Sequence, residues 1–371
     1  MKIVCFYLPQ FHEIPENNEW WGKGYTDWRA AKNAKQYSRK QRQPRVPLDD
    51  NYYDLSDENA SALKWQAGLA EQYGIYGFCM YHYWFHGRHI LEKPVEIFRQ
   101  HKEIKLHYSL CWDNNTFKRT WYANKNEQEV LIQQDYGDEA VWTQHFMDLL
   151  PYFSDERYIK IDNKPVFHIY RAHQIECLEE MLICWKRLAK ENGFAGVYMI
   201  AGDSDNRGRV KGTNELDAYY NFEPQHAYHI NIHKMYGRTC ILAGGIKKRL
   251  NALFHTSFLP YVRNAKGIYR CMVKDNVQTP KKVYYGMFAD YDDTPRRQER
   301  GVVYAGNSLE LFKDALRKQI RKSVQAENEF LYINAWNEWG ESAYLEPDER
   351  NGYAYLECIQ RVLQEENVYG N

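Results

Sequence analysis

Residues 2–17 read KIVCFYLPQFHEIPEN, and this stretch decides between the two common α/β architectures. Its first part, residues 2–8, is a short apolar run of the kind that forms a buried strand. A doubly wound nucleotide-binding sheet places a glycine-rich phosphate loop directly after its first strand. Residues 9–17 contain no glycine. The first strand therefore favours a closed barrel over an open doubly wound sheet.

Seven more apolar runs of strand length follow, and amphipathic stretches separate most of them. The runs lie at residues 76–83, 107–112, 166–170, 197–201, 217–222, 283–289 and 330–336. The stretches with helical periodicity lie at residues 58–73, 90–101, 138–150, 173–192, 309–323 and 353–364. Strands that alternate with helices predict a parallel sheet, and eight such units predict an α/β fold closed into a (β/α)₈ TIM barrel.

The length of 371 residues fits one large barrel with insertions, and no Pro- or Ser-rich linker divides it. We therefore predict one catalytic barrel domain over residues 1–371. The spare length follows strands, in connections at about 9–57, 113–137 and 223–280. These βα loops crowd the C-terminal face of a barrel, where active sites lie. We expect the insertions to form the walls of a cleft there.

Charge and cysteine usage exclude several classes of protein. Lys plus Arg equals Asp plus Glu, at 49 each, so no overall field attracts nucleic acid, and we expect no nucleic-acid partner. The eight cysteines are scattered without a CxxC pair, which indicates free thiols. A strand-like run begins at residue 2, where a signal peptide would otherwise stand. These features predict a cytoplasmic location, and no apolar run approaches the roughly 18 residues of a membrane span.

One insertion is strongly basic. Residues 231–282 contain eleven Lys or Arg and a single acid, Asp275. A charge run of this kind usually forms a solvated face. The alternatives are a site for an anionic ligand, such as a phosphate or a uronate, and weak peripheral contact with an anionic membrane, because apolar pieces such as ILAGGI interleave with the charges.

Polar and aromatic residues follow the predicted strands, where each would point into the mouth of the barrel. Acids, amides and histidines hydrogen-bond hydroxyl groups, and aromatic rings pack on the C–H faces of sugars. The chain holds 31 Tyr, 16 Phe and 11 Trp, although a core built from large rings explains the same composition. We predict an oligo- or polysaccharide partner. The predicted substrate-binding residues are Gln10, His12, Trp21, His82, Tyr83, Trp84, Trp112, Asp113, Asn114, Arg171, Asp203, Glu223, Asp290, Trp336 and Asn337.

Two patterns that could hold a metal are weak. His82 and His86 have a four-residue spacing but lack the glutamate of a helical HExxH zinc motif. D-x-D pairs occur at residues 203–205 and 290–292, but a lone pair of this kind is common by chance, and Asp290 is better placed to line the barrel mouth or to bond Arg296. We expect no metal and no cofactor.

Glu338 and Glu341 are the candidate catalytic pair. Cleavage of a glycosidic bond needs two carboxyl groups, one to protonate the leaving oxygen and one to act as nucleophile or base. Side chains three residues apart in a helical turn lie about 5 to 6 Å apart, and coupling between two such charges favours retention of one proton. The alternative is that one glutamate caps a turn, or that both are solvated.

The sequence also resembles known families over most of its length. Residues 334–348, NAWNEWGESAYLEPD, resemble the WNEW-x-E segment of glycoside hydrolase family 99, the endo-α-mannosidases and endo-mannanases. The chain looks closer to the glycosyltransferase WbsX family of bacterial polysaccharide loci. The matching segments are residues 6–28 (FYLPQFHEIPENNEWWGKGYTDW), 77–94 (GFCMYHYWFHGRHILEKP) and 290–297 (DYDDTPRR).

The resemblance implies a TIM barrel with its catalytic pair after the last strand. Carried over from family 99, Glu338 is the base that helps the sugar's own 2-hydroxyl attack, and Glu341 is the general acid and base of a retaining reaction. Gly340 and Ser342 depart from the WNEWHEG pattern of the family 99 hydrolases, so mannose as substrate does not follow.

Three functions are compatible with these features. The first is a retaining glycoside hydrolase, with endo action on a bacterial polysaccharide or on its oligosaccharide precursor. The alternative is a glycosyltransferase in O-antigen or capsule biosynthesis. The third is a glycan-binding barrel without catalysis, which would leave both glutamates idle.

Overall fold

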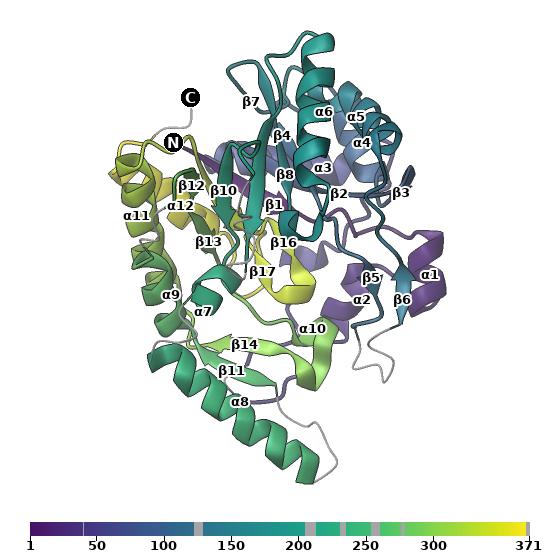
Figure 1. Ribbon diagram of the computed structural model, residues 1–371. Helices are drawn as coiled ribbons and strands as arrows, with labels where there is room; N and C mark the ends of the chain where they lie inside the picture. Colours follow the sequence, from purple (N-terminus) through teal and green to yellow (C-terminus); the bar gives the residue numbers. More distant parts are fainter. Residues whose placement is uncertain are drawn as a thin grey trace.

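The computed structural model describes residues 1–39, 41–121, 129–204, 213–230, 235–253, 260–275 and 279–368. Its centre is a parallel sheet with the strand order β12-β10-β9-β8-β4-β2-β1-β15-β13 (Figure 1). The strands are β1 (Lys2–Tyr7), β2 (Gly77–Phe85), β4 (His107–Trp112), β8 (Lys164–Ile169), β9 (Tyr198–Asp203), β10 (Ala218–Asn221), β12 (Lys282–Tyr284), β13 (Gly286–Phe288) and β15 (Phe330–Asn334). Each of the eight predicted runs overlaps at least one of them, so the strand prediction is confirmed.

The two ends of this sheet meet within one stretch of chain. Only Tyr285 separates β12, which pairs with β10, from β13, which pairs with β15. The backbone N–H of Tyr332 donates to the carbonyl of Tyr285 at 3.1 Å. A Cβ at Gly286 would lie 2.0 Å from the carbonyl oxygen of Asn221, so only glycine permits this close approach. β12 and β13 therefore form one interrupted strand, and the barrel is nearly closed with eight strand positions.

Helices cover the outside of the barrel. Asp138 begins α5 by accepting hydrogen bonds from the backbone of Ala140 and Val141, and Ser308 begins α11 in the same way. Each helix buries one apolar face, as Trp185 of α6 shows. The six helices predicted from periodicity are all present. They are α3 (Ser61–Gln72), α4 (Lys93–Gln100), α5 (Glu139–Phe153), α6 (Leu178–Glu191), α11 (Leu309–Gln325) and α12 (Ala354–Glu365).

Large aromatic rings fill the barrel interior. Phe6 of β1 lies 5.8 Å from Tyr81, 5.2 Å from Tyr220 and 5.8 Å from Tyr332, measured between ring centroids. Offset and edge-to-face contacts of this kind suit ring pairs at 4.5 to 7 Å. Much of the high aromatic content is therefore core.

The long loops lie together at the end of the barrel away from the N-terminus of β1 (Figure 1). This is the C-terminal end of the strands, as predicted. The loop elements are α1 (Pro15–Trp21), α2 (Asp27–Lys32), β5 (Phe117–Lys118), β6 (Val130–Ile132), α7 (Gln225–Ile230), α8 (Met235–Leu253), β11 (Tyr261–Asn264), α9 (Ala265–Val273), α10 (Thr294–Arg297), β14 (Val302–Ala305), β16 (Asn337–Glu338) and β17 (Ala343–Tyr344). Two short strands, β3 (Arg88–Ile90) and β7 (Lys160–Ile161), pair antiparallel with β2 and β8.

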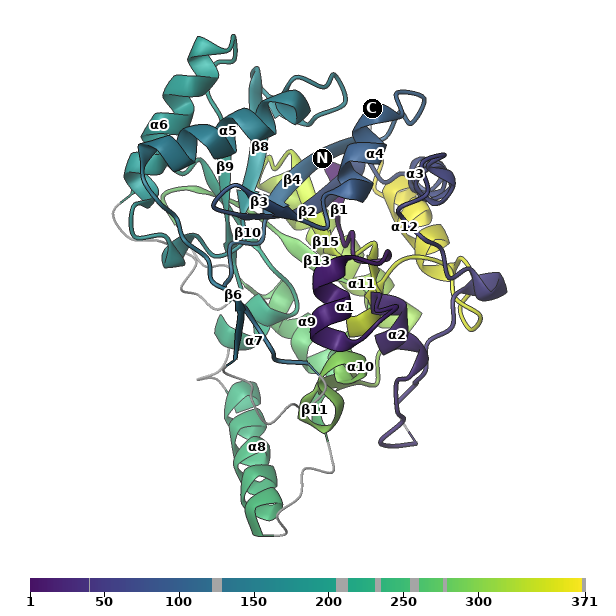
Figure 2. The same cartoon turned by 90° about the vertical axis from the view of Figure 1, so that its right-hand side faces the viewer.

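Helix α8 extends away from the rest of the molecule (Figure 2). Leu242, Ile246 and Leu250 are spaced by four residues, so they lie on one face of α8, and they are 67%, 60% and 44% exposed. This helix belongs to the basic insertion. No helix within the described ranges is both long and apolar enough to cross a lipid bilayer.

Candidate active site

The two glutamates lie on a tight hairpin that follows the last strand. β16 contains Glu338, a short 3₁₀ turn over Trp339–Glu341 contains Glu341, and β17 returns antiparallel to β16. The side chain of Asn337 fixes the hairpin to the first strand: it accepts from the backbone N–H of Leu8 at 2.7 Å and donates to the Leu8 carbonyl at 3.0 Å. The carboxyl groups are therefore carried by backbone that is tied to the barrel.

One buried arginine contacts both carboxyl groups. Arg296 of α10 donates from Nη2 to Glu338 Oε2 at 2.8 Å and from Nη1 to Glu341 Oε1 at 3.1 Å. Its Nε donates to Asp27 Oδ1 at 2.9 Å. All three acids are thus arranged around a single guanidinium group, and we call these four residues the Arg296 cluster.

Gly340 belongs to this arrangement because its missing side chain leaves room for Arg296 and Asp27. Its backbone N–H donates to Asp27 Oδ2 at 3.0 Å. A Cβ at position 340 would lie 2.4 Å from Arg296 Nε and 2.7 Å from Asp27 Oδ2. No side chain fits between the two glutamates while the ion pair of Arg296 with Asp27 is in place.

The Arg296 cluster carries more acids than bases. Burial is the largest influence on Glu338, and it raises the pKa of this carboxyl to about 8 against the opposing effect of Arg296. The neighbouring charges of Glu341 and Asp27 add to the increase. Burial lowers the pKa of Arg296, but the three carboxylates outweigh it and hold that pKa well above its usual value. Burial and the two neighbouring acids therefore favour the protonated form of Glu338 in the ligand-free protein.

Both glutamates line a cavity of about 590 Å³ at the C-terminal end of the barrel. The Glu341 side chain is 21% exposed and that of Glu338 is 8% exposed. Trp21 and Trp121 stack in the wall, with centroids 5.2 Å apart and planes 24° apart. The size and the aromatic lining suit a ligand with C–H faces and many hydroxyl groups. Other rings in the lining belong to Trp20, Tyr81, Tyr83, Phe117, Tyr170, Phe222, Tyr291 and Tyr304.

The structure brings seven of the predicted site residues together in this cavity. They are Gln10, Trp21, Tyr83, Asp113, Arg171, Glu338 and Glu341. Asn114 does not line the cavity, but it supports Arg171: its Oδ1 accepts from the Arg171 backbone N–H at 2.8 Å, and its Nδ2 donates to the Arg171 carbonyl at 3.0 Å. Asn337 has the supporting position described above.

Three predicted residues on β2 and β4 lie on the other side of the sheet. His82 Nε2 lies 2.9 Å from His145 Nε2, and the Trp84 ring stacks on His145 at 4.0 Å. Trp112 also packs against His145, at 4.7 Å between centroids. The prediction that these side chains enter the barrel mouth is therefore wrong. Strand β2 continues to Phe85, and successive side chains of a strand point to opposite faces, so Tyr81 and Tyr83 point into the barrel while His82 and Trp84 point toward α5.

Two more predicted residues belong to a buried charged group behind the cavity. His226 Nε2 lies 2.9 Å from Asp275 Oδ2, and His226 Nδ1 lies 3.4 Å from Asp203 Oδ2. Burial lowers the pKa of His226, but hydrogen bonds to the two aspartates outweigh it and raise the pKa to about 9. Glu223 accepts from the Ala227 backbone at 2.9 Å. Asp203 and Glu223 thus hold α7 against the barrel, and Asp205 lies outside the described residues.

The remaining predicted residues have other surroundings. Trp336 is buried against Phe78, with ring centroids 5.0 Å apart, and His12 is buried and absent from the cavity lining. Asp290 bonds Arg45 at 2.7 Å rather than Arg296, and it lines a second cavity.

Sequence reasoning did not identify Asp27 as part of the site, and it considered only Asp290 as a possible partner of Arg296. Asp27 lies 269 positions before Arg296 in the chain. The only signal was the position of both residues within the motifs at 6–28 and 290–297.

Comparison with known proteins agrees with the fold and gives a family. The family described as Glycosyltransferase WbsX matches residues 3–359. WxcX from Xanthomonas campestris pv. campestris is 30% identical over 366 residues, which cover 97% of this chain and 49% of WxcX. The chain therefore spans about half the length of the curated relatives it matches.

Two solved structures have the same fold. The family 99 endo-α-mannosidase from Bacteroides thetaiotaomicron, in complex with Bis-Tris-propane, has a TM-score of 0.57 at 12% identity and covers 98% of this chain and 97% of its own. A glycoside hydrolase-like protein has a TM-score of 0.58 at 12% identity and covers 97% and 93%.

Proposed function

The chain belongs to the glycosyltransferase WbsX family, and we propose that it is a retaining enzyme that cleaves a glycosidic bond in a bacterial polysaccharide or in its oligosaccharide precursor. The observation that carries this proposal is the position of Glu338 and Glu341. Both carboxyl groups lie in one aromatic-lined cavity and share the guanidinium group of Arg296. Two carboxyl groups aimed at one space are what glycoside cleavage needs.

In the first step, the Glu338 carboxylate takes the proton of the sugar's 2-hydroxyl, and that oxygen attacks the anomeric carbon. Glu341 donates its proton to the leaving oxygen as the glycosidic bond breaks. The product at this stage is a 1,2-anhydro sugar. These roles are the ones that the resemblance to family 99 implies.

In the second step, Glu341, now a carboxylate, takes a proton from water, and the water oxygen attacks the anomeric carbon. The bond from the anomeric carbon to O2 breaks, and O2 recovers its proton from Glu338. Both glutamates return to their starting states. Two inversions at the anomeric carbon give net retention of configuration.

The proton on Glu338 controls when this cycle begins. With a pKa of about 8, Glu338 is mostly protonated at neutral pH, but the base role needs the carboxylate. The hydrogen bond from Arg296 at 2.8 Å stabilises that carboxylate. We therefore assign the active form of the site to the state in which Glu338 is the carboxylate and Glu341 carries the proton of the pair.

A second candidate reaction uses the same residues. If the hydroxyl of another sugar replaces water in the second step, the enzyme transfers the glycosyl group instead of hydrolysing it. The family description favours such transfer, since it names glycosyltransferases. An acceptor sugar with the correct hydroxyl would then yield a longer product, whereas hydrolysis yields only shorter ones.

Substitution of each glutamate tests the proposal. Glu338→Gln and Glu341→Gln keep the side-chain shape but remove the proton chemistry, so each should lower turnover at least a thousandfold. Glu176→Gln is the matched control, because Glu176 is exposed and outside the cavity. The assay is a screen of capsular and O-antigen polysaccharides with mass-spectrometric product analysis, and NMR reports the anomeric configuration. Full turnover by either glutamine variant would overturn the assignment, and an inverted product would overturn the two-step route.

A further inference from the structure

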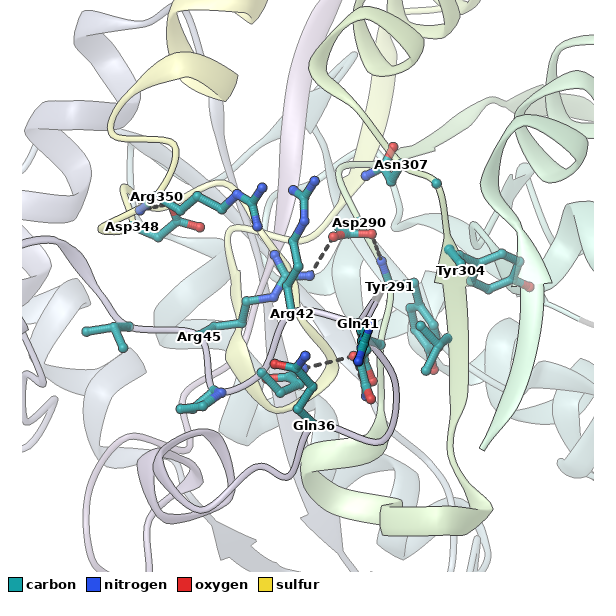
Figure 3. Close-up of a pocket in the computed structure, with 18 of the residues that line it drawn as sticks. Gln36, Gln41, Arg42, Arg45, Asp290, Tyr291, Tyr304, Asn307, Asp348 and Arg350 are labelled. Carbon is teal, nitrogen blue, oxygen red and sulfur yellow. Dashed lines mark hydrogen bonds and ion pairs between the residues drawn. The ribbon is translucent and has the colours of Figure 1, made fainter. Parts of the chain in front are cut away.

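A second cavity, of about 710 Å³, lies behind one wall of the proposed active site (Figure 3). The wall consists of residues 290–293 and β14, and Tyr291 and Tyr304 of this wall line both cavities. The volume is large enough for one or two sugar rings or for a sugar phosphate. Neither glutamate of the catalytic pair lines it.

Three arginines point into the same part of this cavity. Figure 3 shows Arg42, Arg45 and Arg350 beside Asp290. Arg45 Nη2 lies 2.7 Å from Asp290 Oδ2, while its buried Nε has no hydrogen-bond partner among the described residues. The guanidinium groups of Arg42 and Arg350 have no ion pair or hydrogen bond within the described part of the chain. Burial lowers the pKa of Arg42, and the charges of Arg350 and Arg45 lower it further.

The acidic side chains of the cavity do not bind all of the N–H groups of these arginines. Four arginines and four acids line it, so the lining has no net charge. The Asp292 carboxylate accepts from the side chains of Gln41, Gln43 and Thr294. The Asp348 carboxylate accepts from the hydroxyl of Tyr344 at 2.6 Å. Asp292 and Asp348 thus accept from neutral donors, Asp290 takes one N–H of Arg45, and the guanidinium N–H groups of Arg42 and Arg350 remain for a ligand.

We propose that this cavity binds an oxyanion carried on a sugar, with Arg42, Arg45 and Arg350 as its ligands. A guanidinium group presents up to five N–H donors in a plane and matches carboxylate and phosphate oxygens in pairs. Such charge-assisted bonds are about twice as strong as neutral ones. The carboxylate of a uronate residue and the phosphate of a sugar phosphate both fit this chemistry.

The site is connected to the catalytic hairpin by hydrogen bonds. Gln43, two residues before Arg45, donates from Nε2 to Asp292 at 3.0 Å and to the Ser342 hydroxyl at 2.8 Å. The Asp292 backbone N–H donates to the Glu341 carbonyl at 2.8 Å. A ligand that fixes the loop around Arg42 and Arg45 therefore acts on the segment that carries Glu341.

Calorimetric titration of the whole protein with three probes tests the proposal. Glucuronate and inorganic phosphate are the two anionic probes, and glucose is the neutral control. We expect saturable binding of at least one anion, weaker at high salt, and none of glucose. Binding of glucuronate alone identifies a uronate site, and binding of phosphate alone identifies a phosphate site. If neither anion binds, the proposal is wrong.

Variants locate the binding. The double variant Arg42→Gln and Arg350→Gln should weaken anion binding at least tenfold without a change in melting temperature, since neither guanidinium group has a partner in the described fold. Arg361→Gln, at an exposed position on α12, is the matched control and should bind as the unmodified protein does. Unchanged binding by the double variant would overturn the assignment to this cavity. Neither outcome depends on turnover by the catalytic pair.

Discussion

Replacement of Gly340 by alanine tests whether the Arg296 cluster organises the active site. The new Cβ would lie 2.4 Å from Arg296 Nε and 2.7 Å from Asp27 Oδ2, much closer than non-bonded atoms approach. Arg296 cannot move aside freely, because Glu338 and Glu341 hold its other two nitrogens. Alanine must therefore lengthen the 2.9 Å ion pair of Arg296 with Asp27 or displace the hairpin.

The expected loss of unfolding free energy follows from these two responses. Overpacking of a tight interior costs about 1 to 3 kcal/mol of unfolding free energy. A buried ion pair that loses one partner costs about 3 to 5 kcal/mol. Unfolding entropy of about 2 cal/mol/K per residue over 371 residues converts each kcal/mol into roughly 1 °C of melting temperature. We expect melting to fall by about 1 to 6 °C and turnover to fall at least tenfold, because a displacement of about 1 Å at a reacting group can cost a hundredfold.

The assay combines thermal melting with turnover of the glycan that the polysaccharide screen identifies. Gly68→Ala is the matched control, because a Cβ there meets nothing within 4 Å and alanine stabilises a helix interior by about 0.5 to 1 kcal/mol. Displacement of Arg296 also removes the influence that lowers the pKa of Glu338, so this pKa should rise further. Normal melting together with normal turnover in Gly340→Ala would refute the role given to the Arg296 cluster.

Two further predictions concern pH and membranes. The proposed first step needs one proton on the pair, carried by Glu341 while Glu338 is the carboxylate. The pair loses its last proton as pH rises past about 8, the pKa of Glu338, so kcat/KM should fall there, and kcat/KM that keeps rising above pH 8 would contradict proton donation by this pair. The apolar face of α8 and the basic residues of its insertion favour contact with an anionic lipid surface, so the protein should sediment with phosphatidylserine vesicles at low salt, and Ile246→Glu should abolish this. Val324→Glu, at a similarly exposed position on α11, should sediment normally, and equal sedimentation of both variants would count against the α8 surface.

The fold was predictable because buried parallel strands leave a clear pattern. Runs such as 2–8 and 330–336 are almost wholly apolar, since helices cover one face and the aromatic interior covers the other. The interruption at Tyr285 was not predictable, because residues 283–289 read as one continuous run. That break depends on the close approach of Gly286 to Asn221 across the sheet.

The site was predictable only in part, because its residues come from distant positions in the chain. Tyr83 and His82 are neighbours in sequence, and only the true end of β2 determines which of them faces the cavity. The sequence offered Asp290, which is close in the chain, as one possible partner of Arg296, whereas the fold pairs Arg296 with Asp27 and the two glutamates. Which of several acids an arginine bonds depends on the tertiary fold, and the periodicity of the sequence does not show it.

The attachment of Asn337 to Leu8 links the first strand to a segment that is synthesised late. These two residues are 329 positions apart, and β1 pairs directly with β15. While the chain is still on the ribosome, β1 keeps one unpaired edge until β15 has been made, and an exposed edge invites pairing with other chains. The same late event brings Glu338 and Glu341 to their places. A nascent chain that stops before β15 has neither a closed barrel nor the pair Glu338 and Glu341.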